Sequence, residues 1–125
     1  MERFKKTIKK IAALTGGALM VGASMAGALA ALGPDCCATE PPELIGSGIS
    51  VSTAQPEIIT ETVEIINKIN AKVVALCGAG ITNSGDVDKA LELGTRGILV
   101  ASGVVKAANP EKILLEMAEV SQKYQ

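Results

Sequence analysis

Glu40 is the residue of this sequence whose type and position best suit proton transfer. It ends a short apolar run that starts at Cys36, and the loop sequence Pro-Pro-Glu-Leu-Ile-Gly-Ser-Gly follows it at residues 41–48. A proline pair stiffens the first hinge of such a loop, whereas Gly46 and Gly48 let the second hinge turn and let backbone N–H groups approach an anion closely. The pattern predicts a carboxylate base beneath a lid loop.

The alternative interpretation of Glu40 is an ordinary solvated carboxylate at the end of a strand. Glu43 is close enough in sequence to suggest a carboxylate pair, but lid carboxylates are usually solvated, so paired chemistry receives little weight. The sequence contains no histidine. A base at Glu40 therefore acts without the commonest acid–base partner.

Two further loops of small residues follow apolar runs. Residues 78–80, Gly-Ala-Gly, come after the run 73–77, and residues 101–103, Ala-Ser-Gly, come after the run 97–100. The carboxyl ends of parallel strands meet at one edge of a sheet, where such proteins bind ligands. A single glycine pair is weak evidence, but three successive loops predict a phosphate site made of backbone N–H groups. The residues around which these groups lie are Gly46, Gly80 and Ser102.

The elements that must position these loops alternate between strands and helices. Apolar residues at helical spacing predict a helix over residues 56–69, with Pro56 at its first position. A second helix starts with a cap at Ser84 and ends at Gly94, and Pro110 opens a final helix. The apolar face of that helix consists of Ile113, Leu114, Met117 and Val120. This order predicts an α/β fold of three consecutive βα units with parallel strands, as a sheet or as a slice of a barrel.

Composition excludes several classes of function. With 12 basic and 13 acidic residues, one Phe and one Tyr, the chain lacks the charge and the stacking surface of a nucleic-acid-binding protein. Its three cysteines do not have the spacing of a zinc site, and there is no histidine to join them. We expect Cys36, Cys37 and Cys77 to be small apolar strand residues in a reducing compartment, and we expect neither a metal nor a cofactor.

The N-terminal segment differs from the rest of the chain. Five basic residues among the first ten precede an uncharged stretch, residues 11–32, rich in Ala, Gly and Met. The stretch is about as long as the ~20 residues that span a membrane, and Ala28-Leu29-Ala30 has the A-x-A pattern of a signal-peptidase site. A cleaved signal peptide, a membrane anchor and a soluble alanine-rich helix buried against the sheet all fit. The start of the segment also resembles the leaders of archaeal surface-layer proteins. We therefore divide the chain into a leader or apolar anchor helix, residues 1–29, and an α/β domain, residues 30–125.

Four stretches between residues 30 and 121 carry a family resemblance. They read Ala-Ala-Leu-Gly-Pro-Asp at residues 30–35, Glu-Pro-Pro-Glu-Leu-Ile-Gly-Ser-Gly-Ile at 40–49, Leu-Cys-Gly-Ala-Gly-Ile at 76–81 and Ala-Ser-Gly-Val at 101–104. Together they resemble the C-terminal part of archaeal triosephosphate isomerase. The resemblance implies a partial TIM (β/α)8 barrel that retains the sixth, seventh and eighth βα units.

The resemblance also implies a role for each candidate site residue. Glu40 corresponds to the general base, which moves a proton between adjacent carbons of dihydroxyacetone phosphate and glyceraldehyde 3-phosphate. Residues 41–48 correspond to the mobile lid, and five residues correspond to the binding site of the substrate phosphate. These five are Ile45, Gly46, Gly80, Ala101 and Ser102.

Two elements of the family's site have no counterpart here. The family uses a histidine from its fourth strand and an Asn-x-Lys from its first to stabilise the developing enediolate oxygen. Losing one such donor commonly costs about a hundred- to a thousandfold in rate, so the resemblance implies a fragment that is nearly or wholly inactive alone. Its ligand would be a triose phosphate or a phosphate ion.

A slice of a barrel leaves sheet edges unpaired and its inner face uncovered. Either residues 11–32 cover part of that face, or the chain self-associates or meets a complementing N-terminal barrel fragment. Two other functions remain open: an exported or membrane-tethered non-catalytic interaction module, and a hybrid reading frame without a selected function. The family resemblance implies a cytoplasmic location, whereas a working N-terminal signal implies export or a membrane anchor.

Overall fold

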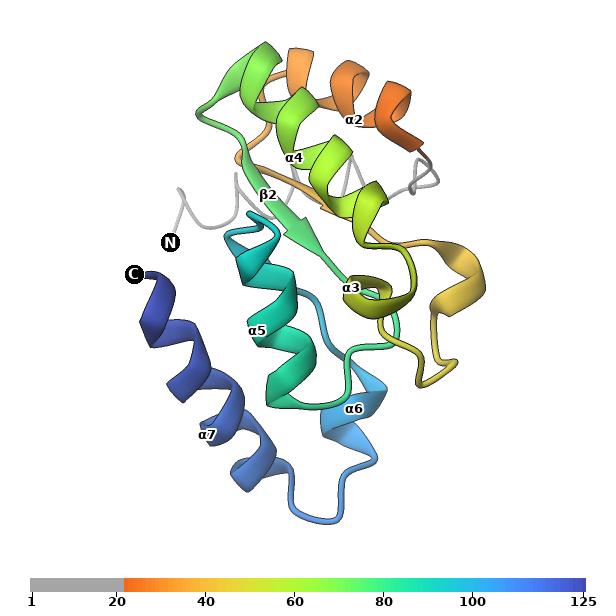
Figure 1. Cartoon of the computed structure of the whole chain (residues 1–125), viewed down its shortest axis with the longest axis vertical. Helices are drawn as coiled ribbons and strands as arrows, with labels where there is room; N and C mark the ends of the chain where they lie inside the picture. The colour runs from red at the N-terminus through yellow and green to blue at the C-terminus, as the bar shows by residue number, and fades with distance from the viewer. Residues whose placement is uncertain (1–21) are drawn as a thin grey trace, which may run out of the picture.

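The computed structural model describes residues 22–125, which form a three-stranded parallel sheet with helices packed against it (Figure 1). The strands, in their order across the sheet, are β1 (Cys36–Thr39), β2 (Val74–Cys77) and β3 (Gly97–Ile98). β1 pairs with β2 along its whole length, and β2 pairs with β3 through Leu76 and Cys77. Parallel neighbours require a crossover connection between them. The α/β fold of parallel strands alternating with helices is therefore confirmed.

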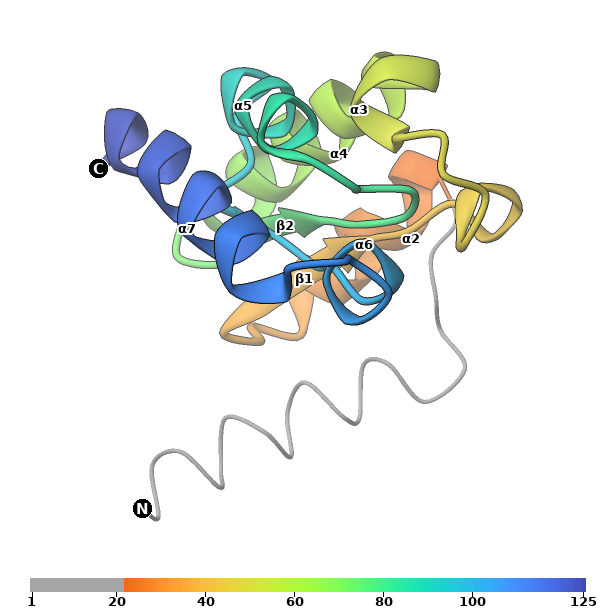
Figure 2. The same cartoon turned by 90° about the horizontal axis from the view of Figure 1, so that it is seen from below.

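Helices follow the strands in the predicted order. They are α2 (Gly22–Ala31), α3 (Val51–Ala54), α4 (Pro56–Asn70), α5 (Ser84–Glu92), α6 (Ser102–Val105) and α7 (Pro110–Ser121), with 3-10 turns η1 (Pro42–Leu44) and η2 (Gln122–Tyr124). The predicted helix over residues 56–69 is α4, and the predicted final helix is α7. α2 lies beside α4 and α7 lies beside α5, and α3 contacts both α4 and α5 (Figure 1 and Figure 2).

Three short elements depart from the prediction. Residues 41–55, predicted as a loop, contain η1 and α3, and α6 begins within the predicted loop 101–103. Each of these elements is about one turn long, which is too short to show an apolar period in the sequence. The sequence predicts a strand over residues 97–100, but β3 is assigned only to Gly97 and Ile98. Leu99 N still donates to Cys77 O at 2.7 Å just beyond it.

The two faces of the sheet differ in burial. Cys37, Thr39 and Cys77 point toward the helices and are at most 8% exposed. On the opposite face, which we call the inner face, Val74 is 39% exposed and Leu99, just past β3, is 36% exposed. Successive strand residues point to opposite faces, so one face packs under the helices while the other stays open. The described elements thus leave the inner face partly uncovered.

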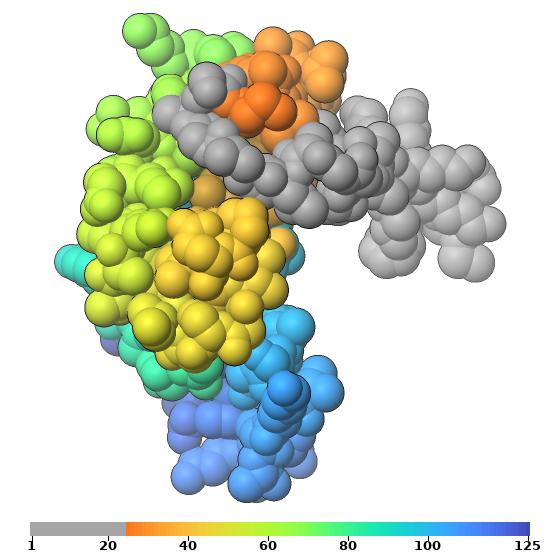
Figure 3. Space-filling view, turned by 90° about the vertical axis from the view of Figure 1, so that its right-hand side faces the viewer, coloured from red at the N-terminus to blue at the C-terminus, as the bar shows by residue number. Residues whose placement is uncertain are grey.

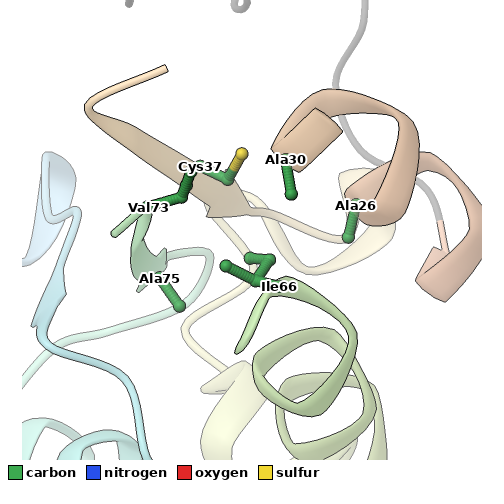
Figure 4. Packing of buried hydrophobic residues seen from close by; sticks show 6 residues of the cluster. All are labelled: Ala26, Ala30, Cys37, Ile66, Val73 and Ala75. Carbon is green, nitrogen blue, oxygen red and sulfur yellow. The ribbon is translucent and has the colours of Figure 1, made fainter. Parts of the chain in front are cut away.

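The described part of the apolar N-terminal segment is a helix of the outer layer. Ala26 and Ala30 of α2 pack with Ile66 of α4 and with residues of β1 and β2 in one core cluster (Figure 4). α2 therefore lies against α4 and the helix-facing side of the sheet and not over the inner face. The predictions made for residues 1–21 lie outside the described residues. Between residues 22 and 125, every helix is too short or too polar to cross a membrane.

The apolar face predicted for the last helix is only partly buried. Met117 is 5% exposed, and Ile113 and Val120 pack against the cluster that contains it. Leu114, predicted on the same face, is instead 49% exposed, and its neighbour Leu115 is 58% exposed. α7 meets α5 on one side, and Leu114 and Leu115 lie outside that contact. The exposed leucines are a second apolar surface that the described part of the fold does not cover.

Candidate active site

A cavity of about 310 Å³ opens at the carboxyl ends of the strands. The end of β1, the lid loop 41–48, and the loops after β2 and β3 form its wall. The lining residues are Glu40, Ile45, Gly46, Ala79, Gly80, Ile81, Leu99, Val100, Ala101 and Ser102. Every residue that the sequence predicts as the base or as a phosphate ligand is among them. In Figure 3 the lid loop (yellow) and the segment around α6 (blue) lie on the same face of the molecule.

Glu40 follows β1 directly, and its carboxyl group lies over Gly78 at the end of β2. The Glu40 Cδ atom is 3.1 Å from the point where a Cβ on residue 78 would stand, and Glu40 Oε1 is closer still. Gly78 N donates to Thr39 O at 2.9 Å, which holds the two strand ends side by side. The missing side chain at Gly78 therefore leaves the space that the carboxyl group occupies. The sequence alone marks residue 78 only as a turn glycine, because the approach of Glu40 is a contact between two strands.

Burial raises the pKa of Glu40 above its ordinary value. Burial also raises the pKa of Cys77 to about 12, and the charge of Glu40 adds to that rise. A carboxylate with a raised pKa is a stronger base than a solvated one, which favours removal of a proton from carbon. Glu43 does not line the cavity, and its Oε1 instead accepts a hydrogen bond from Gln55 Nε2 at 3.2 Å. The cavity thus contains one carboxylate and not a pair.

The lid loop has a fixed base and an exposed tip. Leu44 is buried, whereas Ile45 next to it is 57% exposed. Gly46 and Gly48 have φ angles of 72° and 76°, in the left-handed region that favours glycine, and a Cβ on either would meet nothing within 4 Å. Ser47 Oγ donates to Leu44 O at 2.8 Å and closes the turn. The glycines predicted to form the second hinge therefore have the backbone conformation that such a hinge requires.

The loop after β2 has two successive residues in the left-handed region, Ala79 with φ 81° and Gly80 with φ 70°. A Cβ on Gly80 would collide with Ile49 O, so only glycine fits at this position. Val51 N donates to Ala79 O at 3.1 Å, which ties the loop to the far end of the lid. A non-glycine residue with positive φ is uncommon and tends to occur at functional sites. Ala79 was not predicted from the sequence, because alanine gives no sign of a positive φ.

The loop after β3 packs directly on the loop after β2. A Cβ on Gly103 would collide with Ile81 O and would stand 2.9 Å from Thr82 Cα. Val105 N donates to Ala101 O at 2.9 Å, which fixes Ala101 at the start of the α6 turn. The three loops are therefore linked in series, since the second contacts both the lid and the third. This linkage brings the predicted phosphate ligands around one cavity.

α5 begins one residue earlier than the sequence analysis predicts. The cap is Asn83 and not Ser84, because Asn83 Oδ1 accepts from Asp86 N at 3.0 Å. Asp86 Oδ2 accepts in return from Asn83 N at 3.3 Å and from Thr82 N at 2.9 Å. This capping box fastens the loop after β2 to a helix. An Asn followed three residues later by Asp is the sequence pattern that would have identified it.

Among the residues that the structure describes, no three Cys, Asp or Glu side chains gather as a metal ion would require. The cysteines Cys36, Cys37 and Cys77 have free thiols and lie in strands, as the sequence predicts. Burial raises the pKa of all three thiols. They are therefore poor nucleophiles and contribute to packing.

A protein-family model described as triosephosphate isomerase matches residues 7–119. The chain belongs to the triosephosphate isomerase family. The match includes every residue that lines the cavity, and it begins at residue 7, so it overlaps most of the segment that the sequence analysis assigns to a leader. The division between residues 29 and 30 stays a prediction, and α2 runs across it.

Archaeal triosephosphate isomerases are among the relatives of this family member. The enzyme of Methanothermus fervidus is 57% identical over 90 residues, which are 72% of this chain and 40% of that protein. The enzyme of Methanocaldococcus jannaschii is 56% identical over 90 residues, which are 72% of this chain and 41% of that protein. The chain thus spans about two-fifths of the length of the triosephosphate isomerases that it matches.

A solved structure supports the fold of this triosephosphate isomerase relative. A chain of the Amycolatopsis orientalis BexX/CysO complex matches 81% of this chain with a TM-score of 0.66, over 38% of its own length. The sequence identity is 24%, so the likeness concerns the fold alone. Together with the parallel strands and alternating helices, it is consistent with a partial TIM barrel.

Proposed function

We propose that this chain supplies the base and the phosphate-binding loops of a triosephosphate isomerase site, and that it does not isomerise triose phosphate by itself. The observation that supports this most directly is that Glu40 and three successive loops line one cavity. Backbone N–H groups of the loops would hold the phosphate of a triose phosphate or a free phosphate ion. A substrate held in this way would place the carbon atom adjacent to its carbonyl group beside the Glu40 carboxylate.

Each candidate residue has one role in this proposal. Glu40 is the general base that takes the proton from carbon and returns it to the neighbouring carbon. The lid contributes the backbone of Ile45 and Gly46 to the phosphate, and the two later loops complete the phosphate site. The residues from those loops are Gly80, Ala101 and Ser102. The reaction needs no cofactor, because the proton moves between adjacent carbons without a change of net oxidation state.

Proton removal next to a carbonyl also needs a donor to the developing enediolate oxygen. The sequence has no histidine, and the residues that line the cavity include no lysine, arginine or asparagine. Loss of one such donor costs about a hundred- to a thousandfold in rate. We therefore infer that the chain alone is nearly or wholly inactive and that a complementing piece of barrel must supply the donors.

A complementation assay tests this proposal. The full chain is mixed with the part of the Methanothermus fervidus enzyme that lies outside the match, and conversion of dihydroxyacetone phosphate to glyceraldehyde 3-phosphate is followed with each component alone and with both. We expect activity in the mixture at least about a hundredfold above either component. Glu40→Gln should remove that activity, whereas Glu43→Gln, which changes a carboxylate outside the cavity, should keep it.

Two results would contradict the proposal. Full activity of this chain without a partner would show that the missing donors are not needed. A stable complex in the mixture, detected by size-exclusion chromatography, that remains inactive would show that Glu40 and the loops do not form a working half of the site.

A non-catalytic interaction module, exported or membrane-tethered, is the second candidate function. The partly uncovered inner face favours it, because the apolar residues Val74, in β2, and Leu99, just past β3, are more than a third exposed. Sedimentation of the full chain measures its oligomeric state, and titration with inorganic phosphate measures its affinity for that ion. A stable oligomer without phosphate affinity would favour the module. A hybrid reading frame without a selected function would instead give little soluble protein.

A further inference from the structure

We propose that Ser52 is a positioning residue for the far end of the lid, residues 50–52, because its buried hydroxyl ties this segment to the first turn of α5. The lid then turns at Gly46 and Gly48, while the segment beyond them stays fixed against the loop after β2. A part for Ser52 in phosphate binding rests on the proposed function, whereas the tie itself can be measured without a ligand.

The hydroxyl groups of Ser50 and Ser52 form a buried chain of hydrogen bonds. Ser52 is 0% exposed and Ser50 is 4% exposed. Ser52 Oγ donates to Asp86 O at 3.1 Å, and it lies 2.7 Å from Ser50 Oγ. A hydroxyl has a single proton to donate, and that of Ser52 goes to Asp86 O, so Ser50 is the donor between the two serines. Breaking the chain would leave a buried polar group without a partner, which is costly.

Asp86 connects this chain to the cavity loops. α3 lies beside α5, and Asp86 is on the first turn of α5 (Figure 1). Its carbonyl oxygen accepts from Ser52, while its carboxylate accepts from Thr82 N at 2.9 Å in the loop after β2. One residue of α5 therefore holds the far end of the lid through its backbone and the loop after β2 through its side chain.

The far end of the lid differs from the tip in burial. Val51 is 0% exposed, and its N donates to Ala79 O at 3.1 Å. Ile49, two residues earlier, is 57% exposed, and Gly48 has positive φ with nothing within 4 Å of a Cβ there. Movement of the lid that preserves the bonds of Ser52 must therefore take place before residue 50.

Hydrogen exchange of the full chain, followed by amide NMR, tests the tie. In the wild type we expect the buried Val51 amide to exchange much more slowly than the Gly46 amide at the lid tip. Ser52→Ala leaves Asp86 O without its donor, so the Val51 amide should exchange about tenfold faster. This rate is taken relative to the Ile66 amide within α4, because a general loss of stability would speed both amides alike.

Ser121→Ala is the matched control. It removes the bond from Ser121 Oγ to Met117 O at 2.8 Å, which lies on α7 and does not contact the lid. The ratio of the Val51 and Ile66 exchange rates should stay within about twofold of the wild-type ratio. Equal ratios in the two variants would overturn the proposal. If Ser52→Ala fails to fold, the wild type still decides, because exchange of Val51 as fast as that of Gly46 would show that the far end of the lid is not held.

Titration of the same proteins with inorganic phosphate measures what the tie does for the proposed site. Ser52→Ala should weaken phosphate affinity about tenfold, because a released lid adopts the binding conformation less often. Ser121→Ala should keep the wild-type affinity. Phosphate binding that is equal in both variants would overturn the positioning role of Ser52. A wild type without phosphate affinity would contradict the proposed phosphate site, and the exchange ratios would still decide whether Ser52 holds the lid.

Discussion

The side chain of Glu40 occupies the space that is free because residue 78 is a glycine. The carboxyl group of Glu40 lies where a Cβ on residue 78 would stand, and the backbone bond from Gly78 N to Thr39 O keeps the two strands in register beside it. Position 78 thus sets both the direction of the carboxylate and the burial that raises its pKa. The position of the Glu40 carboxyl group therefore depends on the absent side chain at residue 78.

Gly78→Ala should turn the Glu40 side chain away from the strand ends and toward water. We expect the pKa of Glu40 to fall back toward its ordinary value, because the burial that raises it is lost. Carboxyl ¹³C NMR titration of the full chain, with Glu40 assigned by comparison with Glu40→Gln, measures this. Ala118→Ser, at an exposed position of α7 that does not line the cavity, is the control and should leave the Glu40 titration unchanged. An unaltered Glu40 titration in Gly78→Ala would show that residue 78 does not position the carboxyl group.

Glu40→Gln should make the chain more stable at neutral pH. The folded chain has a pKa for Glu40 above the ordinary value of 4.5. Between these two values the folded state keeps a proton that the unfolded state has released, so the free energy of unfolding falls as pH rises through this window. In urea unfolding from pH 4 to pH 8, the free energy of unfolding of the variant should rise relative to that of the wild type across this window. Below the ordinary pKa of 4.5 the two free energies should be alike. A difference that grows as pH falls would contradict the sign of the pKa shift.

At the level of the elements, helix caps and backbone hydrogen bonds next to the cavity loops hold these loops in place. The loop after β2 is fastened by the capping box of Asn83 and Asp86 and by the bond from Val51 N to Ala79 O. α7 has a similar cap, since Asn109 Oδ1 accepts from Lys112 N at 3.0 Å, but that cap lies away from the cavity lining. The two caps allow a matched comparison.

Asn83→Ala and Asn109→Ala should each lower the free energy of unfolding by about 1 kcal/mol, because each removes an N-cap acceptor. Only Asn83→Ala should also shift the amide resonance of Gly80, since only that cap holds the loop after β2. Denaturant unfolding gives the first quantity, and a two-dimensional amide spectrum of the full chain gives the second. Equal effects of the two substitutions on Gly80 would mean that the cap does not position the loop.

The sequence predicts the long elements and the loops that end in glycine, and it misses the one-turn elements. α4 has apolar residues at helical spacing over four turns, and Gly46 can be predicted to have positive φ because the lid must turn there. α3 and α6 are too short to show a period. The positive φ of Ala79 follows from its bond to Val51 and from the contact of Gly80 with Ile49, which are tertiary contacts. The small residues of α2, part of which the sequence analysis assigns to a leader, make a close contact with α4 that composition does not predict, and the division at residues 29 and 30 stays a prediction.

At the scale of the whole molecule, the described chain has one packed face and one open face. The helix-facing residues of the sheet are buried, while Val74 and Leu99 on the inner face and Leu115 on α7 are exposed. An open sheet with apolar residues on its uncovered face tends to associate or to bind a partner. The cavity stands at the edge of this face, so any partner that covered the face would also reach Glu40. The complementing piece of barrel proposed above would both cover this face and reach the cavity.

If the three loops beside Glu40 hold a phosphate, the full chain should bind inorganic phosphate. We would titrate the chain with inorganic phosphate and record its amide NMR spectrum. We expect saturable shifts confined to the loops around Gly46, Gly80, Ala101 and Ser102, and larger affinity in Glu40→Gln, because the variant removes a negative charge from the same cavity. A dispersed spectrum without a saturable shift at these residues would show that the loops do not form a phosphate site.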